Sequence, residues 1–155
     1  MVKYVIFFAM IIGEYTTKVG EKKRIAVPSK FRKELGSNLI LTRGYEKALI
    51  LVNKKMWDKV ASEIVNGSFI NRNIRETSRF LVGSASEVIP DSQGRIVVPK
   101  SLFEYADFQA EVIFIGLINW IEIWDSKQWE IKLTFLNKNG DKIAESLTNT
   151  SDGKK

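Results

Sequence analysis

Residues 20–28 read Gly-Glu-Lys-Lys-Arg-Ile-Ala-Val-Pro, and residues 91–99 read Asp-Ser-Gln-Gly-Arg-Ile-Val-Val-Pro. The arginines of the two copies, Arg24 and Arg95, are 71 positions apart, and the prolines that end the copies have the same separation. This period is longer than the ~20–50-residue unit of solenoid proteins. The duplication therefore predicts one half-domain used twice, with a pseudo-twofold axis inside a single chain and an arginine-bearing loop in two copies.

The same elements recur around each copy. Short β-prone runs flank each loop, which predicts one β-hairpin per copy. These runs are residues 15–19 and 24–27 in the first copy, and residues 82–89 and 95–98 in the second. A short helix is predicted after each proline, followed by two apolar strands. The helices cover residues 29–35 and 100–105, and the strands residues 39–41, 49–52, 112–115 and 121–124.

Residues 52–57 and 124–129 also resemble each other, and each segment ends in a tryptophan that we expect to pack in the core. Apolar residues at helical spacing predict an amphipathic helix over residues 54–66, with Asn53 in the N-cap position. The equivalent residues 129–136 fit either a strand, by their period-two alternation, or a helix. The repeat favours the helix.

The two ends of the chain differ from the repeats. Residues 1–12 are nearly all apolar, with Lys3 their only charge, and are too short for the ~20-residue span of a bilayer. An additional strand and a start codon annotated too early, with Met10 as the initiator, both fit this segment. Near the other end, Asn139-Gly140 predicts a turn in a polar tail. The chain divides into an extension (1–12), a first repeat (13–66), a connector (67–81), a second repeat (82–136) and the tail (137–155).

The composition excludes several classes of protein. Of the 155 residues, 45% are hydrophobic, which is enough for a buried core, and none is Cys or His. Disulfides, Cys/His metal sites, thiol nucleophiles and imidazole bases are therefore excluded. The chain also lacks a Gly-rich phosphate loop and a separated carboxylate pair. We expect a cytoplasmic protein that is not an enzyme, with no cofactor, no metal, no small-molecule substrate and no membrane partner.

The charge is distributed unevenly along the chain. Residues 1–83 contain 16 Lys+Arg against 7 Asp+Glu, a net charge of +9. Residues 84–155 contain 8 against 11, a net charge of −3. A basic half joined to a mildly acidic half fits a surface that faces a polyanion, and scattered solubilising lysines are the less favoured alternative on charge alone.

The tip of the first loop places three cations in a row, Lys22, Lys23 and Arg24. Such side chains repel one another unless an anion lies opposite. A two-stranded ribbon fits the major groove of B-DNA, where arginine binds guanine bidentately and lysine neutralises phosphates. A solvated charge run is the commoner fate of such a tripeptide, and the second copy of the loop shifts the balance towards DNA.

In the second loop, Asp91 and Gly94 predict a capped turn. The aspartate closes the turn and the glycine takes a positive φ, so that Arg95 points outward. Three further arginines lie at spacings of three and four in the connector, where they either contact phosphates or solvate the linker. They are Arg72, Arg75 and Arg79.

Together these residues resemble the MraZ family of bacterial transcription regulators, within the AbrB-like superfamily. The similarity runs from about Met10 to Trp129 and includes Gly13-Glu14-Tyr15, both loop copies and Ile121-Glu122-Ile123-Trp124. The resemblance implies a mainly β protein with short flanking helices, a double-split β-barrel of two swapped-hairpin repeats. It also implies a ring-forming homo-oligomer of the cytoplasm or nucleoid. Such proteins, usually repressors, bind short direct repeats of double-stranded DNA in the promoter of the division and cell-wall gene cluster, which includes their own gene.

Residue by residue, the resemblance puts the DNA-contacting arginines at Arg24 and Arg95, with Lys22 at a basic loop position. The first loop departs from the family pattern, because Gly20 stands at the place of the family's Asp and Lys23 at the place of its Gly. Lys23 adds a charge to the DNA-facing tip. The resemblance therefore does not imply the loop geometry or the operator sequence of this protein. It does imply a preference for a polyanion.

An AbrB-type antitoxin or protein-binding scaffold is the alternative. Such antitoxins usually carry one copy of the motif and a longer disordered tail. Two copies followed by a short polar tail favour the DNA-binding regulator.

Overall fold

The computed structural model describes residues 11–152 of the chain, with side chains described as far as Thr148. Of these, residues 11–125 form one compact unit, and residues 126–152 belong to a second. Most of the apolar extension, residues 1–10, lies outside the described residues, so its two explanations both stay open. Ile11 and Ile12 belong to the first strand of the compact unit.

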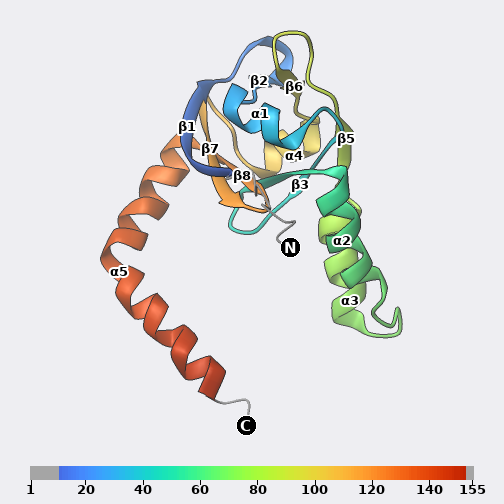
Figure 1. Ribbon diagram of the computed structural model, residues 1–155, viewed down its shortest axis with the longest axis vertical. Coiled ribbons are helices and arrows are strands. Elements are labelled where there is room, and N and C mark those ends of the chain that lie inside the picture. The colour runs from blue at the N-terminus through green and yellow to red at the C-terminus, as the bar shows by residue number, and fades with distance from the viewer. Residues whose placement is uncertain (1–10, 153–155) are drawn as a thin grey trace, which may run out of the picture. The chain divides into compact units, whose positions relative to one another are not determined.

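Residues 11–125 contain eight strands and short helices, which confirms the mainly β fold class (Figure 1). In chain order the elements are β1 (Ile11–Lys18), η1 (Glu21–Lys23), β2 (Arg24–Ala26), α1 (Ser29–Leu35), β3 (Leu39–Arg43), β4 (Leu49–Asn53), α2 (Lys54–Val65), α3 (Arg72–Thr77), η2 (Ser78–Val82), β5 (Ser86–Val88), β6 (Arg95–Val97), α4 (Lys100–Tyr105), β7 (Glu111–Ile118) and β8 (Ile121–Asp125). The helices predicted after the two prolines and over residues 54–66 are confirmed. Asn53 caps α2 by accepting a hydrogen bond from the Met56 N–H at 2.8 Å.

The strands form a six-stranded sheet in the order β1-β7-β8-β4-β3-β5 and a two-stranded sheet of β2 and β6. Neither of the two predicted local hairpins forms. β1 is paired along its whole length with β7, and β5 with β3, so β2 and β6 pair with each other instead. This exchange agrees with two repeats of swapped-hairpin type. Among residues 11–152 no strand pairing closes the larger sheet into a barrel.

The register of β2 and β6 places the pseudo-twofold axis. Ile25 lies opposite its own copy, Ile96, and both side chains are fully buried. They join one apolar cluster with Phe31 of α1 and Leu102 of α4, the helices that follow the two prolines. Burying one such side chain stabilises the fold by about 1.5–3 kcal/mol, so pairing the copies anchors both loops on the same core.

The second unit is a single helix, α5 (Ser126–Asp152), which confirms the helix favoured over residues 129–136. The turn predicted at Asn139-Gly140 is wrong, because the helix continues through both residues. The Asn139 amide donates to the Phe135 carbonyl at 2.9 Å, within the helix. Ile143 and Leu147 continue the helical spacing of apolar residues, and that spacing overrides a local turn preference worth about 1 kcal/mol.

Candidate nucleic-acid interface

The two loops of the repeated phrase are built on equivalent hydrogen bonds. In loop 1 (residues 20–24) the Gly20 N–H donates to the Arg24 carbonyl at 2.8 Å. In loop 2 (residues 91–95) the Asp91 N–H donates to the Arg95 carbonyl at 2.9 Å. Each loop is therefore closed across its base by the same bond.

The loops are also joined to each other. The Val27 N–H donates to the Gly94 carbonyl, and the Val98 N–H donates to the Lys23 carbonyl, both at 2.9 Å. These two bonds are related by the 71-residue repeat. In Figure 1 both loops project from the same end of the first unit, where β2 and β6 lie side by side. The sequence-predicted cations of both loops thus share one surface.

The strand register directs both arginines away from the core. Neighbouring residues in a strand point to opposite faces, and directly opposed residues point to the same face. Because Ile25 and Ile96 point inward, Arg24 and Arg95 point outward, as does Val97, which is 53% exposed. The two arginines are diagonal neighbours across the ribbon, with Cβ atoms on the order of 7 Å apart. The pair can present two guanidinium groups to one ligand.

Loop 2 is ordered by the Asp91 carboxylate. Its Oδ1 accepts hydrogen bonds from the N–H groups of Gln93 and Arg95, and its Oδ2 from the Arg95 Nε, each at 2.9 Å. The bond from the Arg95 backbone N–H is the main reason that the pKa of Asp91 lies below its usual value. Gly94 has a φ of 77°, in the left-handed region. Arg95 is consequently held outward, but its charge is partly neutralised by Asp91.

Loop 1 reaches a similar shape without an aspartate. Lys22 and Lys23 both have left-handed backbone angles, with φ of 58° and 57°, and Lys23 occupies the place of Gly94. This conformation costs roughly 1–2 kcal/mol per non-glycine residue. The Lys23 ammonium lies 5.9 Å from the centre of the Phe103 ring on α4, and this contact offsets part of the cost. Within residues 11–148, Arg24 forms no salt bridge, so its charge is not neutralised as that of Arg95 is.

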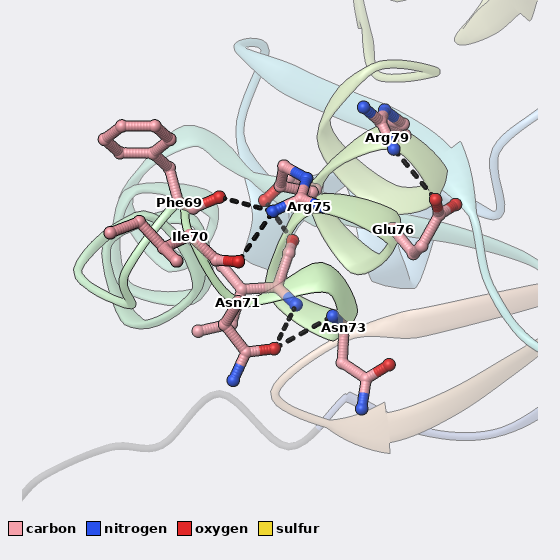
Figure 2. A network of polar contacts seen from close by, with 9 residues as sticks. Phe69, Ile70, Asn71, Asn73, Arg75, Glu76 and Arg79 are labelled. Atoms are coloured by element: carbon pink, nitrogen blue, oxygen red, sulfur yellow. Dashed lines mark hydrogen bonds and ion pairs between the residues drawn. The ribbon is translucent and has the colours of Figure 1, made fainter.

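Two of the connector arginines are bonded within their own segment. Figure 2 shows Arg75 donating to the carbonyls of Phe69 and Ile70, at 2.9 and 2.7 Å, while Arg79 pairs with Glu76 at 2.8 Å. The first arrangement ties down the loop before α3 and the second links successive turns. Both arginines are therefore bonded within the connector, and the two explanations from the sequence, phosphate contact and solvation of the linker, both stay open.

One cation beside loop 2, Arg32, was not indicated as a site residue by the sequence. Arg32 of α1 is half-buried, and its guanidinium lies against the backbone of Gly94. No motif spacing marks this residue. The only signal in the sequence is that its repeat equivalent, 71 residues on, is the aromatic Phe103 rather than another cation.

The described residues include no cluster of three or more His, Cys, Asp or Glu side chains suited to a metal ion. None of the helices within residues 11–152 has the length and apolar character needed to cross a membrane.

The family described as "MraZ protein, putative antitoxin-like" matches the chain twice, over residues 10–80 and 81–149. Each match contains one of the two loops. The chain belongs to the MraZ family. Proteins named "Transcriptional regulator MraZ" are similar over most of their length. The one from Halothermothrix orenii is 38% identical over 89% of this chain and 96% of its own. The one from Clostridium acetobutylicum is 42% identical over 77% and 84%.

The two matches to the MraZ family model coincide with the two repeats that exchange strands. A fold made of two equivalent repeats can pair β2 with β6 because the two strands are copies with the same burial pattern at the central isoleucine. Gly20 and Lys23 of loop 1, which stand where loop 2 has Asp91 and Gly94, nevertheless form a closed loop with the same base hydrogen bond.

Proposed function

We propose that this protein is a transcriptional regulator that binds double-stranded DNA through loops 1 and 2. The observation that carries the proposal is the convergence of Lys22, Lys23, Arg24 and Arg95 on one ribbon end. In this assignment Arg24 reads a guanine, while the two lysines neutralise phosphates. Arg95 contributes less to affinity than Arg24, because Asp91 shares its charge. The names of the relatives describe a regulator and not an enzyme.

The proposed operator consists of spaced direct repeats in the promoter of the division and cell-wall gene cluster, including the protein's own gene, and binding represses transcription. A homo-oligomeric ring would present identical loop pairs at regular intervals. Helix α5 supports self-association, because it exposes large apolar side chains that a partner helix would cover. These are Ile131, Phe135, Ile143 and Leu147, between 42% and 70% exposed.

Selection of bound duplexes from a random pool would identify the operator. Fluorescence anisotropy should then compare duplexes that carry one and two copies of the selected sequence. We expect two correctly spaced copies to bind much more tightly than one, since the second contact is intramolecular. Equal affinity for one and two copies would exclude the multivalent arrangement.

An antitoxin or protein scaffold is the second candidate, and the words "antitoxin-like" in the family description favour keeping it. DNA binding through cations should weaken steeply with salt. A flat dependence between low and physiological salt, together with a larger particle when a candidate toxin is added, would favour the antitoxin.

A further inference from the structure

Arg32 has hydrogen-bonding capacity that the described residues leave unused. Its Nε is buried and has no hydrogen-bond partner in the described part of the chain. A guanidinium carries five N–H donors in a planar fork. The buried Nε is out of reach of an external ligand, so only the Nη groups of this half-buried side chain can bind one.

The guanidinium is held against loop 2 in a defined place. A Cβ built on Gly94 would lie 2.3 Å from both Cζ and Nη1 of Arg32 and 2.5 Å from its Nε. Only glycine leaves room for the guanidinium at this point. The same side chain is therefore packed against the loop that carries Arg95, although it comes from the helix that follows loop 1.

The repeat shows that each loop rests on the helix of the other repeat. Lys23 of loop 1 lies over Phe103 of α4, and Gly94 of loop 2 lies under Arg32 of α1. Lys23 is the repeat equivalent of Gly94, and Phe103 is the repeat equivalent of Arg32, so the cation belongs to the loop in one pair and to the helix in the other. Loop 1 carries its own lysines on an aromatic support, whereas loop 2 has no lysine and receives a cation from its support.

We propose that Arg32 is a phosphate-binding residue of loop 2, contacting the backbone of duplex DNA beside Arg95. This inference rests on the proposed function. Asp91 and Arg95 sum to no net charge, so loop 2 alone offers a polyanion little attraction. The two Nη groups of the guanidinium can donate to phosphate oxygens, and the side chain supplies the missing cation.

The test compares Arg32→Gln with Lys33→Gln, which removes the same charge from an exposed neighbouring position of α1. Affinity for a duplex with a single operator copy is measured by anisotropy over a range of salt concentrations. One lost phosphate contact lowers the slope of log affinity against log salt by about 0.9. The counterion effect alone then weakens binding by about fivefold at 0.15 M salt and about fifteenfold at 0.05 M. We expect these changes for Arg32→Gln at every DNA sequence, and smaller ones for Lys33→Gln.

Arg32→Lys keeps the charge and should retain most of the salt slope, which separates phosphate binding from packing against Gly94. An Arg32→Gln protein that is folded and binds like the wild type would overturn the inference. Arg24→Gln is titrated in parallel. If Arg24→Gln weakens binding and Arg32→Gln does not, only the role of Arg32 fails. If the wild type shows no salt-dependent binding to duplex DNA, or if neither variant weakens that binding, the proposed DNA surface fails as well.

Discussion

Replacing Gly94 by alanine should destabilise the protein through two separable effects. The first is the backbone, because a φ of 77° costs a non-glycine residue roughly 1–2 kcal/mol. Alanine also lowers the conformational entropy of the unfolded chain, which stabilises the folded protein by about 0.4–1 kcal/mol. The net backbone effect is a loss of roughly 1 kcal/mol.

The second effect is steric. The new methyl group would overlap the Arg32 guanidinium, whose atoms lie 2.3–2.5 Å from its position. This is the far end of a flexible side chain, so it can move at a cost of about 0.5–1.5 kcal/mol for a strained rotamer. Gly94→Ala should therefore cost roughly 1.5–2.5 kcal/mol in all, and lower the melting temperature by about 5 °C.

A double-mutant cycle separates the two effects. Urea unfolding is followed by circular dichroism for the wild type, Gly94→Ala, Arg32→Ala and the double variant. In the Arg32→Ala background the steric effect is absent, so Gly94→Ala should cost only the backbone part, roughly 1 kcal/mol. An equal cost in both backgrounds would show that Arg32 does not pack on Gly94. A cost near zero in both would contradict the left-handed backbone at this position.

Three further predictions concern the loops and α5. Arg24→Ala should cost ~1–3 kcal/mol of binding free energy and relax the preference at one base of each operator copy, whereas Lys22→Ala should weaken binding to all sequences about equally. Titrations against matched and mismatched duplexes measure both effects. An Arg24→Ala protein that unfolds but has lost no DNA binding would contradict the assignment. The lowered pKa of Asp91 means that its carboxylate stabilises the fold fully above the usual value of 3.8, and that this contribution disappears as the pH falls through the folded-state pKa. The stability difference between wild type and Asp91→Asn should therefore be constant near neutral pH and shrink below pH 3.8, and a constant difference down to the acid limit would exclude this role. Gly140→Ala should raise the stability of α5 by about 1 kcal/mol, because open space surrounds the added methyl group, and thermal melts at 222 nm that do not shift would favour the interrupted helix instead.

The sequence predicted the elements of this fold better than their partners. Periodicity and capping located α1, α2 and α4 because these signals are local. Local alternation predicted a hairpin within each copy, since alternation marks a strand without naming its neighbour. Only the resemblance to the family implied an exchange between the repeats, which the pairing of β2 with β6 agrees with. Ile25 and Ile96 lie opposite each other because both side chains are then buried in one core, and this burial exists only in the assembled fold.

The candidate site was predictable to a similar extent. The repeated phrase indicated Arg24 and Arg95, because two copies of one loop stand out in the sequence. Arg32 was not indicated, since its significance depends on lying against Gly94, which is 62 positions further along the chain. At Asn139-Gly140 a local turn signal was outweighed by the apolar spacing on either side, which a short window does not include.

The pairing of β2 with β6 also sets an order of events during synthesis. While the ribosome is still translating the first repeat, β2 has no partner strand and Ile25 has no copy to bury against. The ribbon that carries both loops can close only after about seventy further residues have emerged, and such long-range closure slows folding. A nascent chain stalled before residue 95 would expose an unpaired strand edge and an unfinished core. Two such fragments on neighbouring ribosomes could pair through their β2 strands, since β2 is a copy of the β6 strand that both fragments lack.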